Sequence, residues 1–338
     1  MKWYSGIDLH SNNNVVVVID ETDRVVYRRR LENELGKVLE ALEPYRAELG
    51  SVAVESTYNW YWLVDGLQAA GYDVRLANTA KMKRYDGLKH AGDEADAFQL
   101  AHLLRLGILP TGYIYPKAER ALRDLGRRRM QLVRHRSMHV LSVENVQARE
   151  TGARMTSAQI KRLKACSIDT LGLIPDVALG VQASVTVMGT LDSEISRIEK
   201  RLAEALRGKA AYKLLITAPG IWHRLAPVVL LETGAIERFD SVGDYASYAR
   251  CVESVHSSNG KKKGEGNRRN GNKYLAWAYV EAANMARRWC AEAKRFYERK
   301  RSRTNGIVAT KALAHKLARA CYHMLKDEQP FDMKRCFG

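Results

Sequence analysis

Residues 3–10, WYSGIDLH, place an acidic residue, Asp8, inside a run of apolar residues that is typical of a buried β-strand. A second apolar run, SVAVE at residues 51–55, ends in another acid, Glu55. Burying a carboxylate is costly unless it is paired with a cation or bound to a metal. Both acids are therefore expected to have a cationic partner.

A third segment, GDEADAFQLAHLL at residues 92–104, has the pattern of a helix and carries Asp93 and Asp96. Residues three apart project from the same helix face. Together with Asp8 and Glu55, the pair predicts that three segments converge on a divalent-cation site. An alternative is that Asp93 and Asp96 are solvated acids favoured by the dipole at a helix start, but this does not explain Asp8 and Glu55.

The order of apolar runs and turns around these acids predicts an α/β domain. Three strands follow one another in hairpin fashion, and helix, strand, helix, strand and helix come next. The expected strands are 3–9, 15–20, 24–30, 51–55 and 72–77, and the expected helices are 36–49, 58–70 and the helix that carries Asp93 and Asp96. This order is that of the RNase H-like fold, in which an acid on the central first strand lies beside one that ends the fourth strand.

The charge is distributed unevenly along the chain. Residues 1–115 carry 13 Lys/Arg against 16 Asp/Glu, a net charge of −3, whereas the remaining residues carry a net charge of +20. This asymmetry indicates a metal-dependent catalytic part joined to nucleic-acid-binding parts. Membrane-surface binding is the competing explanation, but neither end of the chain shows a basic amphipathic helix with an aromatic face.

Other sequence features narrow the class of protein. No apolar run approaches the ~20 residues that a membrane-spanning helix needs, and no secretory signal is visible at the N-terminus. The five cysteines are scattered without a CxxC pair, which is typical of reduced thiols in the cytosol rather than of a disulfide framework or a zinc site. We therefore expect a cytoplasmic protein.

The middle of the chain, residues 116–208, has a helical pattern with a narrow apolar seam. An Arg-rich helix is expected over residues 117–146. The seam that follows it has an alternating spacing of three and four residues, which favours a coiled coil over an ordinary bundle core. Its members are Val181, Ser184, Met188, Leu191, Ile195, Ile198, Leu202 and Ala205. Residues 209–338 are again helical, with a helix-turn-helix outline at 214–234 and helices at 273–294 and 307–326.

A second unusual segment, HSSNGKKKGEGNRRNGNKYLAW at residues 256–277, lies within this C-terminal part. Glycine and asparagine permit backbone conformations that favour a loop, and the cations favour phosphate. A flexible linker is the alternative for such a loop, but its entrance carries a hydroxyl pair, Ser257 and Ser258, that can serve as a nucleophile if it is activated. The expected nucleic-acid-binding residues are Lys261, Lys262, Lys263, Arg268, Arg269 and Lys273.

The segments GIDLH, AVEST, GDEADA, TAPGI and SNGKKKGEGNRRNGNKYL together resemble the DEDD transposases of insertion sequences, which include the Piv invertases and the bridge-RNA-guided recombinases. The lysine run resembles the subgroup with a KKKGEGN signature. The resemblance implies a RuvC-like N-terminal domain over residues 1–115, a coiled-coil assembly region over 116–208, and a helical transposase domain over 209–338.

The same resemblance implies roles for particular residues. Asp8, Glu55, Asp93 and Asp96 correspond to the metal ligands, which would hold two Mg²⁺ ions. Ser258 corresponds to the serine that attacks DNA and opens a Ser-x5-Gly stretch, here closed by Gly264, although a one-residue gap would put Ser257 in its place. The chain departs from the family pattern at Ala91-Gly92, where Lys-Thr is usual, and at the additional acid Glu94.

The leading hypothesis, which the resemblance implies, is a transposase or site-specific DNA recombinase of an insertion sequence. It would work in the bacterial cytoplasm and associate with the nucleoid when bound to DNA. It would cut and rejoin donor and target DNA through a metal-assisted serine, with a structured noncoding RNA as guide and a homo-oligomer, dimer or tetramer, as the working form. The alternative with the same metal site is a RuvC-like, structure-specific DNA endonuclease that uses water. A non-catalytic nucleic-acid-binding scaffold is a third hypothesis, which leaves Asp8 and Glu55 unexplained.

Overall fold

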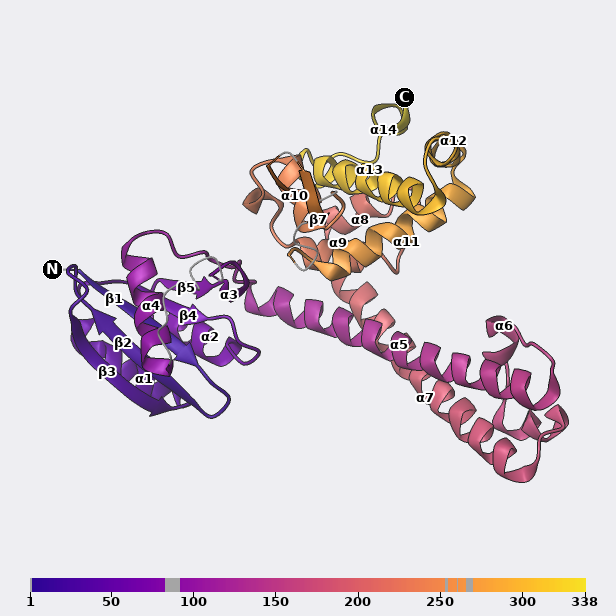
Figure 1. The fold of residues 1–338 in the computed structure, drawn as a ribbon, viewed down its shortest axis with the longest axis horizontal. Helices are drawn as coiled ribbons and strands as arrows, with labels where there is room; N and C mark the ends of the chain where they lie inside the picture. The colour runs from indigo at the N-terminus through magenta and orange to yellow at the C-terminus, as the bar shows by residue number, and fades with distance from the viewer. Residues whose placement is uncertain (1, 83–91, 253–254, 260, 266–269) are drawn as a thin grey trace. The chain divides into compact units, whose positions relative to one another are not determined.

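The computed structural model describes residues 2–82, 92–252, 255–259, 261–265 and 270–338. The chain divides into two compact units, Met1–Lys117 and Ala118–Gly338. The first is a mixed α/β unit, and the second is built almost entirely from helices (Figure 1).

The first unit is organised around a five-stranded sheet in the order β3-β2-β1-β4-β5. β2 runs antiparallel to both β1 and β3, β4 pairs parallel with β1, and β5 pairs parallel with β4. The strands are β1 (Trp3–Leu9), β2 (Asn13–Ile19), β3 (Val25–Glu32), β4 (Leu49–Glu55) and β5 (Val74–Ala77). All five expected strands are therefore confirmed, with ends that differ by one or two residues.

The register of the sheet places two of the predicted acids side by side. β1 and β4 are parallel, and Ile7 of β1 pairs with Val54 of β4. Asp8 and Glu55 are the next residues along these two strands, so the carboxylates leave the sheet at the same edge. A central strand that is buried on both faces has to be apolar along its length, which is why the run around Asp8 contains no other charge.

Helices cover both faces of this sheet. Helices α1 (Leu35–Leu42) and α2 (Tyr61–Ala69) pack on one face, with Val38 and Leu63 in its core. Helix α4 (Asp93–Arg105) packs on the other face through Ala97 and Ala101.

The approach of α4 to β1 depends on Gly6, because a Cβ atom at this position would collide with the backbone of Ala97 and Ala101. Since Gly6 lies two residues before Asp8, the close contact brings the first turn of α4 to the acidic end of β1.

Two expected helices of this unit are shorter than the sequence pattern indicates. The helix expected at 36–49 ends at Leu42, and a 3₁₀ turn, Glu43–Tyr45, follows with Pro44 in its first turn. Proline removes a backbone donor and breaks the regular helix. The helix expected at 58–70 begins at Tyr61, because residues 58–60 form a turn. A four-residue helix, α3 (Thr79–Met82), follows β5.

Two long helices, α5 (Lys117–Thr151) and α7 (Pro175–Leu206), begin the second unit and run side by side (Figure 1). Val140 and Val143 of α5 share an apolar cluster with Val181, Val185 and Met188 of α7. Ion pairs join the same helices between Arg129 and Glu199 (2.5 Å) and between Arg136 and Asp192. Most of the expected apolar seam of α7 is buried, and the coiled-coil geometry itself stays a prediction.

The remaining helices form one core, in which Tyr245, Tyr279 and Leu317 are fully or almost fully buried. The helix expected at 273–294 is broken at Cys290, where the backbone is extended (φ −123°, ψ 120°). Short elements α6 (Ser157–Ile160) and η3 (Ala165–Leu171) connect the two long helices. The core helices are α8 (Ala210–Leu215), α9 (Ala226–Thr233), α10 (Val242–Tyr248), α11 (Lys273–Trp289), α12 (Ala291–Arg301), α13 (Gly306–Lys326) and α14 (Met333–Phe337), with a 3₁₀ turn η4 (Ile236–Arg238) between α9 and α10.

Within the part of the chain that the structure describes, no helix combines the length and the apolar character that crossing a membrane requires.

Candidate metal centre and serine hairpin

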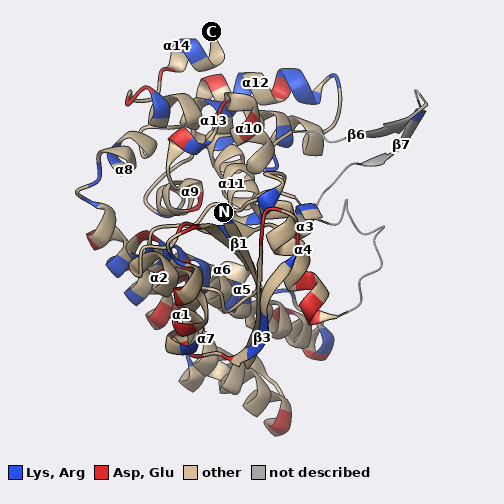
Figure 2. Ribbon diagram, turned by 90° about the vertical axis from the view of Figure 1, so that its left-hand side faces the viewer, with Lys and Arg blue, Asp and Glu red and all other residues tan. Residues whose placement is uncertain are grey.

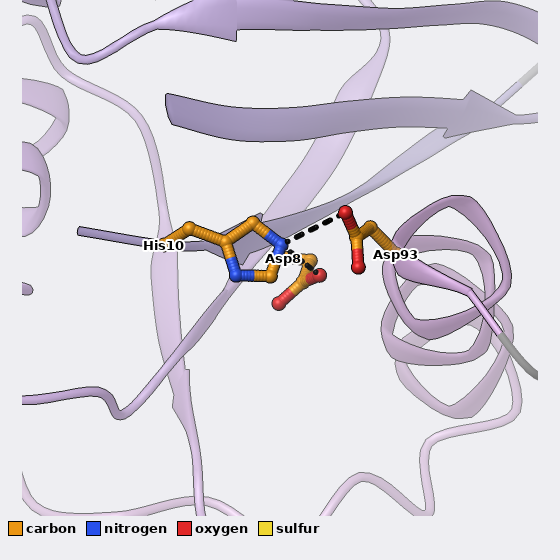
Figure 3. Close-up of side chains that lie close together, drawn as sticks. All are labelled: Asp8, His10 and Asp93. Carbon is orange, nitrogen blue, oxygen red and sulfur yellow. Dashed lines mark ion pairs between the residues drawn. The ribbon is translucent and has the colours of Figure 1, made fainter. Parts of the chain in front are cut away.

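Three side chains from two elements meet at the end of β1 (Figure 3). Asp8 is almost fully buried, with 3% of its surface exposed. Its Oδ2 atom lies 3.0 Å from Nε2 of His10, and the same nitrogen lies 3.3 Å from Oδ2 of Asp93, the first residue of α4. The ligand-type atoms of these three residues all lie within 4.8 Å of one another, a spacing that can accommodate a metal ion.

Glu55 and Asp96 belong to the same cluster. Burial, followed by the hydrogen bond and the negative charge of Asp8 and then by the charge of Asp96, raises the pKa of Glu55 to about 8. Burial also raises the pKa of Asp96, and the charges of Asp8 and Asp93 add to this effect. The structure therefore brings the four predicted acids together, and their role as metal ligands stays a prediction.

This cluster is electrostatically unfavourable without a cation. Neighbouring carboxylates disfavour one another's ionisation, and among the described residues Oδ2 of the buried Asp8 has no contact with hydrogen-bond geometry besides its ion pair with His10. Hard divalent cations such as Mg²⁺ prefer carboxylate oxygens, and an imidazole suits Mn²⁺ and other transition metals as well. The residues present thus fit a divalent metal ion.

Two arginines of β3 face the start of α4. Nη2 of Arg30 donates to Oδ2 of Asp93 at 2.5 Å, and this hydrogen bond is the main cause of a lowered pKa at Asp93. Nη1 of Arg28 lies 3.0 Å from Oε2 of Glu94. Figure 2 shows basic residues on β3 and acidic residues at the start of α4. The additional acid of the motif, Glu94, is therefore paired with an arginine of β3.

His10 and Arg30 were not among the residues predicted from the sequence. His10 follows Asp8 by two positions at the end of a strand, and residues with this spacing share a face of the sheet. That alternation could have identified His10. For Arg30 the sequence contains no such signal, because its contact with Asp93 depends on a helix that begins more than 60 residues later.

The predicted serine lies on a β-hairpin of the second unit. Strand β6 (Val255–Ser258) pairs antiparallel with β7 (Lys261–Glu265), so that Ser258 is opposite Lys261 and Ser257 is opposite Lys262. Asn259 between them has a positive φ of 53°, and Asn-Gly is the preferred sequence of a two-residue hairpin turn. Residues 255–258 and 261–265, which the glycine and asparagine content led us to expect in a loop, are therefore paired strands.

The structure places four of the six predicted cationic residues of this segment. Lys261 is exposed on β7, Lys262 and Lys263 lie on the same strand, and Lys273 begins α11 with its Nζ atom 5.3 Å from the centre of the Tyr274 ring. Arg268 and Arg269 lie outside the described residues.

A buried polar network lies at the start of α11, where the segment that contains the hairpin leads into the helical core. Glu232 of α9 is 2% exposed, and its two carboxylate oxygens accept hydrogen bonds from Nε and Nη2 of Arg127 at 2.6 and 2.8 Å. Nδ2 of Asn272 donates to Oε2 of Glu232 at 2.7 Å, and Oδ1 of Asn272 caps α11 by accepting from the backbone of Tyr274 and Leu275. Helix α5 is thereby joined through α9 to the start of α11.

Replacing Glu232 by glutamine is expected to lower the free energy of unfolding of the second unit by about 2 kcal/mol, since hydrogen bonds to charged groups contribute roughly 1.5–3 kcal/mol. Chemical denaturation of the full chain measures this. The control is Glu194→Gln, because the exposed pair of Glu194 with Arg197 on α7 is worth about 1 kcal/mol or less. Equal effects of the two substitutions would contradict the importance of the buried network.

The acids and the serine belong to different units of the chain. The four carboxylates and His10 lie in Met1–Lys117, and the hairpin lies in Ala118–Gly338.

Comparison with known proteins finds transposase domains both in the part of the chain that carries the acids and in the part that carries the hairpin. Residues 5–146 match a family model for a DEDD-type domain, described as "Transposase", and residues 212–298 match a second model, "Transposase IS116/IS110/IS902 family". The chain is also 24% identical over 336 residues to a protein of Pseudomonas aeruginosa named "Probable family 20 transposase", covering 96% of each sequence. The two models together account for about two thirds of the chain, and they occur in the order of the candidate metal centre and the serine hairpin. The chain therefore combines a DEDD-type transposase domain with a domain similar to the IS116/IS110/IS902 transposases.

Proposed function

We propose that the protein is a site-specific DNA recombinase of an insertion sequence whose reaction combines the acidic centre with Ser258. The observation that carries the proposal is the convergence of Asp8, Glu55, Asp93 and Asp96 at one end of the sheet, in a chain of a transposase family. The strand order β3-β2-β1-β4-β5, with two parallel strands after an antiparallel meander, supports an RNase H-like, RuvC-like assignment for this unit.

The four carboxylates would hold two divalent cations, and His10 lies within ligand distance of the same place. Bound Mg²⁺ would polarise the scissile phosphate and stabilise the attacking and leaving oxygens. The protein's part is to hold the carboxylates on three rigid elements, β1, β4 and α4, so that their geometry is fixed before DNA arrives. Glu94 takes no part in this set, because it pairs with Arg28.

Ser258 would supply the nucleophile. Its hydroxyl oxygen would attack the phosphorus of the scissile phosphodiester and lose its proton to solvent. The bond from phosphorus to the leaving DNA oxygen would break, and that oxygen would take up a proton from solvent to become a DNA hydroxyl. The resulting phosphoserine ester keeps the phosphodiester energy, so a hydroxyl of the exchanged strand can displace the serine without an external energy source.

The working form of the enzyme would be an oligomer, a dimer or a tetramer. Residues 1–115 would be the catalytic domain, 116–208 the coiled-coil assembly region and 209–338 the domain that carries the serine. Because the acids and the serine lie in separate units, the complete site would form when protomers assemble on DNA. Lys261, Lys262, Lys263, Arg268, Arg269 and Lys273 would contact nucleic-acid backbone.

The proposed chemistry is tested with a supercoiled plasmid that carries the element ends and a target. Recombinant products in Mg²⁺, and none with a chelator, are expected. A RuvC-like nuclease that uses water would instead accumulate cut DNA with free 3′-hydroxyl ends, without protein attached and without rejoining. That product pattern would reject the recombinase proposal in favour of the endonuclease.

Guidance by a structured noncoding RNA is a separate part of the proposal. It is supported by the basic second unit, whose helix α12 ends in Arg299, Lys300 and Arg301 (Figure 2). Deleting the noncoding segment that flanks the gene is expected to abolish recombination, and supplying its transcript in trans should restore it. Unchanged recombination after the deletion would remove RNA guidance and leave the protein chemistry intact.

Arg30 provides a more specific prediction. Its guanidinium competes with a divalent cation for Oδ2 of Asp93, so Arg30→Gln is expected to tighten Mn²⁺ binding to the DNA-free protein a few-fold. Calorimetric titration measures the affinity. The matched control is Arg28→Gln, because Arg28 pairs with Glu94 outside the proposed ligand set. Weaker Mn²⁺ binding by Arg30→Gln would mean that the arginine supports the ligand geometry instead of competing with the metal.

A further inference from the structure

The loop that connects β4 to α2, residues 56–60, is held beside the acidic centre. The backbone N–H of Thr57 donates to the carbonyl oxygen of Glu55 at 3.0 Å. Oγ1 of Thr57 donates to Oδ1 of Asn59 at 2.9 Å, and Nδ2 of Asn59 donates to the carbonyl oxygen of His10 at 2.9 Å. Both ends of this chain of hydrogen bonds are residues of the acidic cluster, so the loop has a defined position relative to it.

Four aromatic side chains, Tyr58, Trp60, Tyr61 and Trp62, lie in this loop and at the start of α2. One of them differs from the others in its exposure to solvent. Trp60 is 9% exposed and packs edge-to-face with Tyr61, with 4.6 Å between ring centres. Tyr61 and Trp62 pack against the core of the sheet. Tyr58, in contrast, is 81% exposed, the highest value for a large hydrophobic side chain among the described residues. Three of these side chains stabilise the fold, and the fourth is free for another partner.

We propose that Tyr58 is a stacking site for a nucleobase of the DNA strand whose phosphate is cut at the acidic centre. This inference rests on the proposed function, because it needs DNA at the acids. An aromatic ring on a loop that hydrogen bonds already hold in place loses little conformational freedom when it binds. Base–aromatic stacking accepts any base, because every base has a π-face. The site would therefore add affinity without specifying sequence.

The chemistry of the neighbouring residues favours an aromatic ring over a cation at this position. Cations near the carboxylates pair with them, as Arg30 does with Asp93 at 2.5 Å, and such a pair competes with metal binding. A neutral ring holds the substrate without entering this competition. A protein partner is disfavoured, because a single exposed ring on a short polar loop is not the contiguous apolar patch that protein interfaces use.

The test uses the full chain and short single-stranded oligonucleotides that carry 2-aminopurine at successive positions, in Ca²⁺ to allow binding without cleavage. Stacking quenches 2-aminopurine fluorescence. Wild type and Tyr58→Phe are expected to quench one position of the probe, whereas Tyr58→Ala should lose this quenching and bind roughly tenfold more weakly. Leu106→Ala, which removes another exposed apolar side chain of the same unit, should behave as wild type.

The outcomes separate this inference from the proposed function. Because Tyr58 is exposed, Tyr58→Ala should keep the wild-type melting temperature and its increase in the presence of Mn²⁺. Equal quenching by wild type and Tyr58→Ala, or quenching at no position, would overturn the stacking site. If instead Mn²⁺ does not stabilise even the wild type, the metal centre fails, while the fluorescence comparison still decides the role of Tyr58.

Discussion

Asp8→Asn is expected to reduce recombination by about three orders of magnitude, because a metal ion supplies several kcal/mol of transition-state stabilisation and each 1.4 kcal/mol is a factor of ten in rate. Asp8 is the most buried of the four acids, and it influences the pKa of both Glu55 and Asp96. Removing its charge would take away the central ligand of the proposed site. A plasmid recombination assay in Mg²⁺ measures the effect.

A thermal melting experiment separates loss of metal binding from loss of folding. Mn²⁺ at a hundred times its dissociation constant should stabilise the wild type by about 2.7 kcal/mol, and Asp8→Asn should lose this gain. Without metal, the variant should melt no lower than the wild type, because one of several mutually repelling carboxylates has been removed. The control is Asp73→Asn, an exposed acid paired with Arg75. Full metal stabilisation of Asp8→Asn would reject Asp8 as a ligand.

Ser258→Ala is expected to eliminate the covalent protein–DNA adduct, since alanine has no hydroxyl to form the phosphoserine ester. The adduct is measured on a denaturing gel after reaction with labelled element ends, and a variant without the nucleophile should give no signal above background. Binding of the same DNA should be almost unchanged, because the substitution removes one oxygen atom from a segment rich in cations.

Ser257→Ala is the matched control for this experiment. Ser257 is adjacent on β6 and is opposite Lys262, while Ser258 is opposite Lys261 beside the hairpin turn. The control should form the adduct as the wild type does. The reverse result, adduct formation by Ser258→Ala and none by Ser257→Ala, would move the nucleophile by one residue. Adduct formation by the double variant would eliminate a serine nucleophile from this pair.

The sheet of the first unit was predictable because its strands are short and separated by clear turn signals, and its central strands are apolar. Asp8 lies next to the end of β1 and Glu55 ends β4, so the parallel pairing of these strands brings the two acids together. The helix boundaries were less accurate. Pro44 ends a helix that the apolar pattern alone extends to residue 49, and the break at Cys290 interrupts a pattern that is continuous in the sequence.

The residues that the sequence did not reveal are those whose role depends on tertiary contacts. Arg30 faces Asp93 because β3 and the start of α4 lie together in the folded unit. The link between Arg127, Glu232 and Asn272 likewise joins three distant segments. The glycine and asparagine content of the segment that carries Ser258 favours a loop. The Asn259-Gly260 pair in the same sequence is, however, also the strongest local signal for a hairpin.

The contact between Arg127 and Glu232 restricts how the chain can vary in length. Met130, which lies three residues after Arg127 on α5, is buried in the same helical core, so this face of the helix is fixed by two anchors. Inserting or deleting one residue between Arg127 and Met130 would rotate one anchor relative to the other by about 100° about the helix axis. Related sequences should therefore accept substitutions between these two anchors while keeping the number of residues constant.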